Sequence, residues 1–341
     1  MSALLNVQDL RVRFRTMGAL TARATGMKVP FIDAVCGVSF EIRRGETLGL
    51  VGESGSGKST VARTIIGLQS PVSGRICFEG QELTELSASQ RKPYLRRMAM
   101  MFQDPVGSLS PRLTVQALLT EPFRIHGLSD RDTDAETKRL LRMVGLPADF
   151  ARRYPHQLSG GQARRVGVAR ALALSPDLII ADEPTAGLDV SVQGEVLNLL
   201  ARLQDELGIA LLIITHNLNV VRHMTDRMAI MYLGRFVEVG STEAIFGQPR
   251  HPYTQALLSA NPEPDPDAVL NRIELKGEVP SVMRRPSGCE FHTRCRYAQD
   301  ICSRAFPEPS ADEMDAKHSF KCHFPLERSP LPLKPVAPGE C

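Results

Sequence analysis

The chain has 341 residues, of which 41 are lysine or arginine and 38 are aspartate or glutamate, for a formal net charge of +3. That balance argues against a protein that binds nucleic acid through a strongly positive surface. A content of 43% hydrophobic and 23% charged residues excludes global disorder. At roughly 150 residues per domain, this length predicts about two domains.

Neither a membrane span nor a secretory signal is predicted. The best apolar run, residues 209–214, is far shorter than the roughly 20 residues that a spanning helix needs. The N-terminus lacks both a basic head and a continuous apolar stretch. We therefore expect a cytosolic chain with reduced thiols, in which the seven cysteines serve as metal ligands or bystanders rather than in disulfides.

Strands and helices alternate along most of the chain. Leu10, Val12 and Phe14 alternate with arginines, which predicts a strand with one solvated face, and a polar loop follows at 16–33. Further strands are expected at 35–42, 47–51, 73–80, 98–102, 178–181 and 210–215, and helices at 61–68, 114–125, 132–144, 163–174 and 192–207. This order predicts an α/β fold with a mostly parallel sheet covered on both faces, a hairpin-like β segment, and a helical insertion at about 104–170.

Residues 52–60 read GESGSGKST and fit the phosphate-loop pattern G-x-x-x-x-G-K-[ST] between an apolar strand and a helix. The glycines let backbone N–H groups converge on phosphate oxygens, and the helix N-terminus adds its dipole. Lys58 is expected to contact the β- and γ-phosphates, and the Ser59 hydroxyl to ligate Mg²⁺. The expected nucleotide contacts in this loop are Gly52, Ser54, Gly55, Gly57, Lys58, Ser59 and Thr60.

Two acidic residues end the apolar strand predicted at 178–181. Asp182 is expected at the carboxyl edge of the sheet beside the phosphate loop, where it can hold Mg²⁺ through water. Glu183 lies one residue further along and can position or deprotonate the attacking water.

A second phosphate-binding helix start is predicted at LSGGQ, residues 158–162. Ser159 occupies the N-cap position, and Gly160 and Gly161 allow a phosphate to approach the backbone closely. One chain thus carries two helix N-termini suited to phosphate.

Together these motifs resemble the nucleotide-binding subunit of ATP-binding cassette (ABC) transporters, whose signature sequence is LSGGQ. The resemblance covers residues 4–250, with Gln103 at the Q-loop, residues 187–189 at the D-loop and His216 at the switch histidine. It implies a head-to-tail dimer in which each ATP, with Mg²⁺, lies between the phosphate loop of one subunit and the signature of the other. The signature and D-loop residues so assigned to the nucleotide are Ser159, Gly160, Gly161, Gln162 and Asp189.

The resemblance also implies roles for single residues. His216 would hydrogen-bond the γ-phosphate and help align water with Glu183, and Gln103 would touch Mg²⁺ or water and report the nucleotide state to the helical insertion. Phe14 matches the place where the family stacks an aromatic on adenine, with packing in the strand core as the alternative. Asn217 stands where many relatives have aspartate. This difference is expected to affect the site only modestly, because the essential ring belongs to His216.

Four further stretches resemble the ATPase subunits of bacterial dipeptide and oligopeptide importers: 103–115, 153–162, 251–260 and 275–281. The long loop at 16–33 and the helical region are closest to the F-type member of a D/F pair. This implies ATP hydrolysis that powers uptake of peptides or related small solutes, at the cytoplasmic face of the bacterial inner membrane. The implied partners are two integral membrane permeases, a D-type ATPase or a second copy, and indirectly a periplasmic binding protein, with no nucleic acid. The alternative is a soluble ABC ATPase acting on ribosomes or DNA, which the single phosphate loop and the lack of heptads disfavour.

The last part of the chain is rich in proline and cysteine. The turn-rich stretch at 261–267 predicts a boundary between an ATPase domain at 1–261 and a Cys-rich domain at 262–341. Thiolates suit either an iron–sulfur cluster or zinc. The importer resemblance favours a [4Fe-4S] cluster on Cys289, Cys295, Cys302 and Cys322, while zinc, with His292 or His323, and a metal-free segment stay open. Cys36, Cys77 and Cys341 are expected to be packing residues or free thiols.

Overall fold

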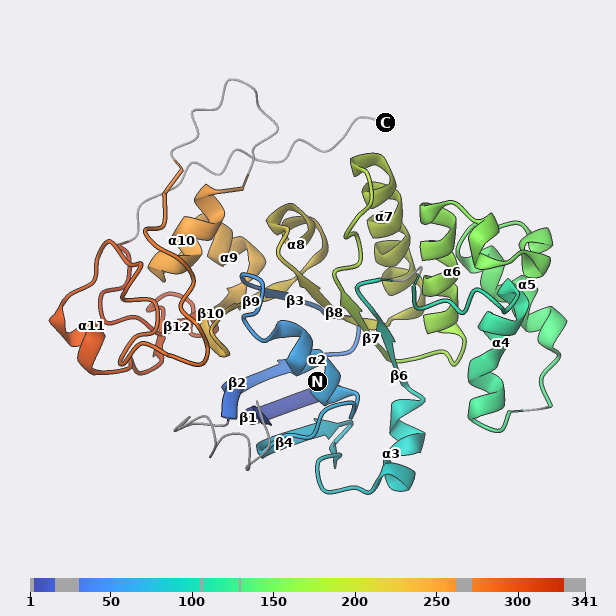
Figure 1. Ribbon diagram of the computed structural model, residues 1–341, viewed down its shortest axis with the longest axis horizontal. Coiled ribbons are helices and arrows are strands. Elements are labelled where there is room, and N and C mark those ends of the chain that lie inside the picture. The colour runs from blue at the N-terminus through green and yellow to red at the C-terminus, as the bar shows by residue number, and fades with distance from the viewer. Residues whose placement is uncertain (1–2, 16–30, 105–106, 129, 262–271, 328–341) are drawn as a thin grey trace, which may run out of the picture.

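The computed structural model describes residues 3–15, 31–104, 107–128, 130–261 and 272–327 (Figure 1). Most of the loop expected at 16–33, most of the expected boundary at 261–267, and Cys341 lie outside the described residues. The described strands form two sheets, one of four strands and one of eight.

The four-stranded sheet is antiparallel and has the order β2-β1-β4-β5. In β1, Leu5, Val7, Leu10 and Val12 are buried. The alternation of buried and exposed residues shifts by one at an irregularity between Val7 and Leu10, which keeps the same face of the strand on the core. Its strands are β1 Leu5–Arg15, β2 Phe31–Ile42, β4 Ser73–Phe78 and β5 Gln81–Glu82.

The eight-stranded sheet has the order β11-β12-β10-β9-β3-β8-β7-β6, and the run from β9 to β6 is parallel. All residues of β3, β7 and β8 are buried, as expected for parallel strands covered on both faces. The strands are β3 Thr47–Val51, β6 Met98–Met101, β7 Leu178–Asp182, β8 Ala210–Thr215, β9 Arg227–Tyr232, β10 Arg235–Ser241, β11 Ser310–Ala311 and β12 Ser319–Phe320.

Helices follow most of the strands of this sheet. The hydroxyl of Ser87 and the side-chain oxygens of Asp189 and Asn217 accept backbone N–H groups at the starts of α3, α7 and α8, which satisfies donors that a helix start leaves free. These helices are α2 Lys58–Ile65, α3 Ala88–Leu95, α7 Val190–Leu207, α8 Leu218–Met224, α9 Thr242–Gly247 and α10 Pro252–Ser259.

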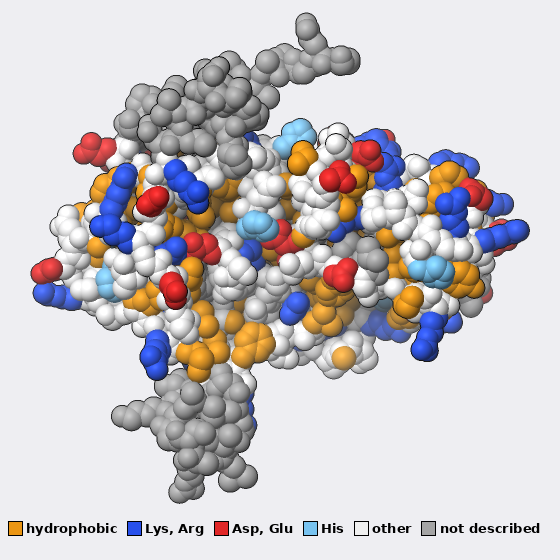
Figure 2. Space-filling model, turned by 45° about the horizontal axis from the view of Figure 1, so that its top comes forward, with side chains coloured by type: hydrophobic (Ala, Val, Ile, Leu, Met, Phe, Trp, Pro, Cys, Tyr) orange, Lys and Arg blue, Asp and Glu red, His pale blue; other side chains and the backbone are white. Residues whose placement is uncertain are grey.

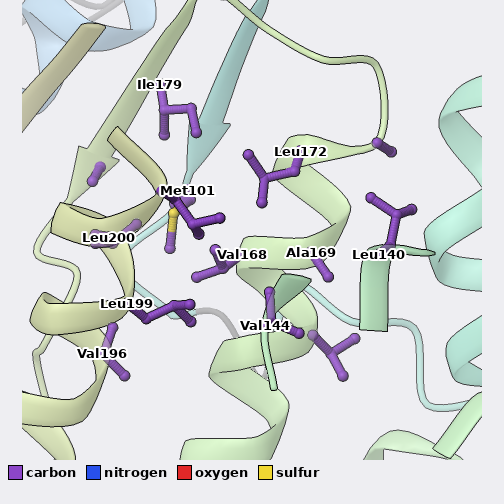
Figure 3. Packing of buried hydrophobic residues seen from close by; sticks show 14 of the residues in the cluster. Met101, Leu140, Val144, Val168, Ala169, Leu172, Ile179, Val196, Leu199 and Leu200 are labelled. Atoms are coloured by element: carbon purple, nitrogen blue, oxygen red, sulfur yellow. The ribbon is translucent and has the colours of Figure 1, made fainter. Parts of the chain in front are cut away.

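A helical segment lies between β6 and β7, where the sequence predicts an insertion. It contains α4 Val115–Ile125, α5 Thr133–Met143, 3₁₀ turns at Ala148–Arg152 and Pro155–Gln157, and α6 Gly160–Leu172. Figure 3 shows α6 contributing Val168 and Ala169 to a cluster that also holds Leu199 and Leu200 of α7. The segment is therefore packed onto the sheet through α6 and α7.

The C-terminal segment, residues 272–327, lies at the opposite end of the molecule from the helical segment (Figure 1). It contains α11 Asp300–Arg304, and its strand β12 pairs antiparallel with β10. The Nε2 atom of His318 lies 2.7 Å from Oε1 of buried Glu238. The C-terminal segment is thus joined to the central sheet by both backbone and side-chain contacts.

None of the described helices is long and apolar enough to cross a membrane. Figure 2 shows acidic and basic side chains interspersed over one face, with several lysine and arginine side chains at the end formed by the helical segment. This face carries no continuous basic field, in keeping with the small net charge.

Candidate active site

Four of the predicted site elements leave the same edge of the central sheet. Val51 pairs with Thr215, Asp182 with Ile214, and Met101 with Ala181. The loops that follow β3, β8, β7 and β6 therefore begin side by side at the carboxyl ends of parallel strands. These loops carry the phosphate loop, His216, Glu183 and Gln103, as the sequence predicts.

Close packing of its neighbours dictates the glycines of the phosphate loop. A Cβ on Gly52 would lie 2.1 Å from the Met231 carbonyl oxygen, and one on Gly57 would lie 2.4 Å from that of Ala34. Gly57 also has φ 106°, a left-handed value that favours glycine. Ser54 and Gly55 are exposed on the outer side of the loop, and Thr60 is half-buried in the first turn of α2.

Lys58 lies buried inside the loop that it follows. Its Nζ donates to the carbonyl oxygens of Gly52 and Glu53, at 2.7 and 2.9 Å, and to Ser56 Oγ at 3.3 Å. Burial lowers the pKa of Lys58, while the carboxylates of Glu183, Asp182 and Glu53 oppose that shift. The Lys58 ammonium is thus held against two carbonyl oxygens and one hydroxyl of the loop.

Two of the three residues predicted to hold Mg²⁺, Ser59 and Asp182, are in contact. Ser59 Oγ donates to Asp182 Oδ1 at 3.1 Å. Burial raises the pKa of Asp182, and the hydrogen bond from Ser59 opposes the rise, so a cation here would relieve an unfavourable buried charge. A hydroxyl and a carboxylate are the hard oxygen donors that Mg²⁺ takes, and these residues fit the ion.

Among the described residues, no three His, Cys, Asp or Glu side chains form a ready group for a metal ion. That agrees with the way Mg²⁺ is usually held, by one or two carboxylates together with substrate phosphates. Gln103 is exposed, two residues beyond the end of β6.

Glu183 and His216 form a hydrogen-bonded pair next to this centre. Glu183 Oε1 lies 2.6 Å from His216 Nδ1 and accepts the backbone N–H of His216 at 3.1 Å. Its other oxygen accepts the hydroxyl of Thr215 at 3.1 Å. The His216 side chain is 72% exposed, whereas that of Glu183 is mostly buried. Glu183 is therefore fixed in orientation at the floor of the site, and His216 stands at its rim.

The signature residues begin α6 on the surface. Ser159 Oγ accepts the N–H of Gln162 at 3.3 Å, and the Gln162 side chain accepts the N–H of Ser159 at 3.0 Å. This capping box fixes the first turn of the helix. Ser159 and Gly160 are exposed and Gly161 is half-buried, so the start of the helix is open to a ligand. Asp189 caps α7 through the N–H of Val192 at 3.0 Å.

Arg164 is a buried residue of this region that no sequence motif singles out. Its guanidinium donates to the carbonyl oxygens of Pro184 and Ala186, the latter at 2.8 Å. It thereby joins the signature helix to the loop that follows Glu183. An arginine in a helix rich in arginines is indistinguishable in sequence from a surface residue.

Two further expectations concern side chains at the margin of the site. Phe14 is 37% exposed on β1, which contradicts the alternative that it packs in the core. Asn217 caps α8, since its Oδ1 accepts the N–H groups of Asn219 and Val220 at 3.0 and 3.4 Å. Aspartate could accept the same bonds, so this departure from the family pattern is structurally small.

The four predicted ligand cysteines border a single pocket, together with residues that include His251, His292, Phe291 and His323. Burial raises the pKa of Cys289 to about 11 and that of Cys322 to about 12, and the neighbouring cysteines add to both shifts. All described cysteines are free thiols, and Cys36 and Cys77 lie outside this pocket. Thiolates are the donors that an iron–sulfur cluster or zinc takes, but among the described residues these four side chains do not form a ready metal-binding group.

Two protein families match this chain. The family described as ABC transporter matches residues 35–186, and the oligopeptide/dipeptide transporter C-terminal region matches residues 237–302. The oligopeptide transport ATP-binding protein AppF of Bacillus subtilis is 46% identical over 325 residues, which cover 94% of this chain and 97% of that protein. The probable peptide ABC transporter ATP-binding protein y4tS of Sinorhizobium fredii is 46% identical over 338 residues, covering 99% and 93%.

Solved structures with the same fold are ATP-binding cassettes. A dimeric post-hydrolysis state of the cassette MJ0796, bound to ADP and Pi, is 28% identical with a TM-score of 0.61, covering 70% of this chain and 98% of that one. The structure of cbiO1 from Clostridium perfringens, part of the ABC transporter complex cbiONQ, is 27% identical with a TM-score of 0.60, covering 72% and 91%.

Proposed function

This chain belongs to the ABC transporter family, in its oligopeptide and dipeptide branch, and from that premise we propose how its residues bind and hydrolyse ATP. It is the ATPase of a peptide importer and works with membrane permeases in a transporter complex. The alternative of a ribosome- or DNA-directed factor is not favoured by these relatives.

The phosphate loop holds the triphosphate of ATP. Lys58 turns from the carbonyl oxygens of Gly52 and Glu53 toward the β- and γ-phosphates, which offer it stronger, charge-assisted bonds. Ser59 and Asp182 would hold Mg²⁺, and Gln103 would contact the ion or its water. When bound, the ion neutralises the charge that develops on the phosphates.

Glu183 positions the attacking water and accepts its proton, while His216 hydrogen-bonds the γ-phosphate. The observation that carries this assignment is the Glu183–His216 contact of 2.6 Å, at the strand ends that also carry Lys58 and Asp182. Because Thr215 and His216 bond both oxygens of Glu183, the carboxylate keeps its direction without having to reorganise during the reaction.

A second ATPase subunit completes the site. The signature residues, from Ser159 to Gln162, face the ATP of the partner in a head-to-tail dimer with a second copy or a paralogous D-type ATPase. The exposed, capped start of α6 and the likeness to a dimeric cassette support this arrangement. The dimer lies at the cytoplasmic face of the inner membrane, on two permeases that receive substrate from a periplasmic binding protein.

Replacement of Glu183 by glutamine tests this mechanism. The variant is expected to bind Mg-ATP normally and to lose about 10²–10⁴-fold in kcat, because glutamine cannot accept the proton. Lys58→Ala is expected to lose ATP binding instead. Steady-state ATPase assays and calorimetric titration with Mg-ATP measure both, with the exposed Glu206→Gln as the control. Normal turnover of Glu183→Gln would disprove the assignment of Glu183.

The chain divides into an ATPase domain at 1–261, with a helical subdomain at about 104–170, and a Cys-rich domain at 262–341. The Cys-rich domain holds a [4Fe-4S] cluster. Cys289, Cys295, Cys302 and Cys322 are its ligands, and the cluster has a structural role because a segment this small has little core. Iron, sulfide and zinc are measured in anaerobically purified protein. About four irons and four sulfides per chain are expected. One zinc per chain without sulfide would contradict the cluster and show that the cysteines bind zinc.

A further inference from the structure

The second residue of the phosphate loop, Glu53, is held by side chains from the C-terminal third of the chain. Arg294 donates two hydrogen bonds to its carboxylate, from Nη1 to Oε2 at 2.8 Å and from Nη2 to Oε1 at 3.1 Å. The hydroxyl of Tyr253 accepts the backbone N–H of Glu53 at 3.0 Å. Both the charge and the backbone of Glu53 are therefore fixed from outside the loop.

The arginine has little freedom to leave this position. Its side chain is 7% exposed, and Tyr253 packs against Tyr232 and Phe291 with ring centroids 4.7 and 5.3 Å apart. Burial disfavours the charged guanidinium, but the bonds and charge of Glu53, together with a smaller contribution from Tyr232, outweigh this effect and raise the pKa of Arg294. A bidentate arginine–carboxylate pair of this kind fixes the orientation of the carboxylate as well as neutralising its charge.

The position of Glu53 makes its charge important for ATP. Its own carbonyl oxygen accepts the Lys58 ammonium at 2.9 Å, so the residue adjoins the group that binds phosphate. A free carboxylate here would repel the polyanionic triphosphate and compete with it for Lys58. Pairing with Arg294 neutralises this carboxylate and holds it on the side of the C-terminal segment.

We propose that Arg294 is a positioning residue for ATP binding: it neutralises and restrains Glu53 so that the phosphate loop can accept the triphosphate. The C-terminal segment thereby takes part in building the nucleotide site. This inference rests on the proposed binding of ATP at the phosphate loop and goes beyond it, because no family motif of the ATPase includes Arg294.

The test is Arg294→Gln in the full-length chain, assayed for ATPase activity and titrated with Mg-ATP. The KM for ATP is expected to rise about 10-fold or more, with kcat changed by less than about 3-fold, because the half-buried carboxylate of Glu53 loses its partner next to the ligand. Arg294→Lys keeps the charge without the fork and is expected to give an intermediate KM. A normal KM in Arg294→Gln would overturn the proposal.

A double variant separates this role from a loss of structure. Glu53→Gln removes the charge that Arg294 neutralises, so Glu53→Gln/Arg294→Gln is expected to bind ATP at least about 5-fold more tightly than Arg294→Gln alone. A double variant no better than Arg294→Gln would show that the loss is structural and would overturn the proposal. Should Arg294→Gln fail to fold, Arg294→Lys is compared with Glu53→Gln/Arg294→Lys in the same assay, under the same criterion.

Arg235→Gln is the matched control. Arg235 also joins the body to the C-terminal segment, through Glu290 at 3.1 Å, but it does not contact Glu53. It is expected to lower thermal stability and to leave the KM for ATP unchanged; a KM raised as in Arg294→Gln would overturn the proposal. Retained ATP binding in Lys58→Ala would instead refute the underlying assignment of the nucleotide site, so the two failures are distinguishable.

Discussion

His251 is a fully buried histidine whose charge state is set by its surroundings. Its Nδ1 accepts the backbone N–H of Tyr253 at 3.0 Å, which only the neutral ring can do. Burial lowers its pKa from 6.5 to about 4, against the opposing charge of Glu238. The unfolded chain therefore binds this proton more readily than the folded chain between these two pH values.

We expect the free energy of unfolding to include the full contribution of neutral His251 above about pH 6.5. As the pH drops toward 4, that free energy is expected to fall by about 3 kcal/mol in total. Urea denaturation between pH 4 and 7 measures this slope. His251→Gln is expected to flatten it, whereas His223→Gln, on α8, should leave it in place. An unchanged slope in His251→Gln would assign the acid sensitivity to other groups.

Links between elements are carried by side chains such as Arg164, which ties α6 to the loop after β7. Arg164→Met is expected to lower the free energy of unfolding by about 2–4 kcal/mol, because buried carbonyl oxygens lose their donor. It should also lower kcat at least about 10-fold, since that loop positions Glu183. Thermal denaturation and ATPase assays measure the two effects.

The neighbouring Arg165 provides the control for this prediction. It forms a partly exposed ion pair with Glu195 at 2.7 Å and donates a long hydrogen bond to the carbonyl oxygen of Val144 at 3.3 Å. Contacts of this kind contribute little, so Arg165→Met should cost about 1 kcal/mol. Equal effects of the two substitutions would mean that Arg164 does not link the signature helix to the loop of Glu183.

The elements that place the chemistry could be predicted from sequence because their signals are local. Strands β3 and β8 lie at the predicted residues, and the helix of the phosphate loop begins at Lys58, three residues before the predicted 61–68. Since parallel strands share one carboxyl edge, the proximity of Glu183 and His216 follows from the order of motifs.

Contacts between distant residues could not be predicted in this way. Arg294 and Glu53 are 241 positions apart, and neither residue stands out from an ordinary charged surface residue. Their pairing depends on how the C-terminal segment folds back onto the sheet, which no spacing in the sequence encodes. The same is true of Glu238 and His318.

At the scale of the molecule, the C-terminal segment is continuous with the sheet that carries the site. The sequence predicts a boundary near residue 262, and the segment beyond it adds β12 to the sheet beside β10 and brings Arg294 to the phosphate loop. Figure 1 places this segment at one end of the sheet and the helical segment at the other. The proposed nucleotide site thus lies between two regions, each of which contacts one of its loops.

The pairing of β12 with β10 also bears on solubility. Glu238 and Val239 of β10 pair with Phe320 and Ser319, and Lys321 donates its N–H to Val237. A chain truncated at residue 261 would leave this row of peptide groups bare along a strand that includes Phe236 and Val237. Open strands of this kind recruit other chains into intermolecular sheets, so the isolated cassette is expected to aggregate where the intact chain stays monodisperse.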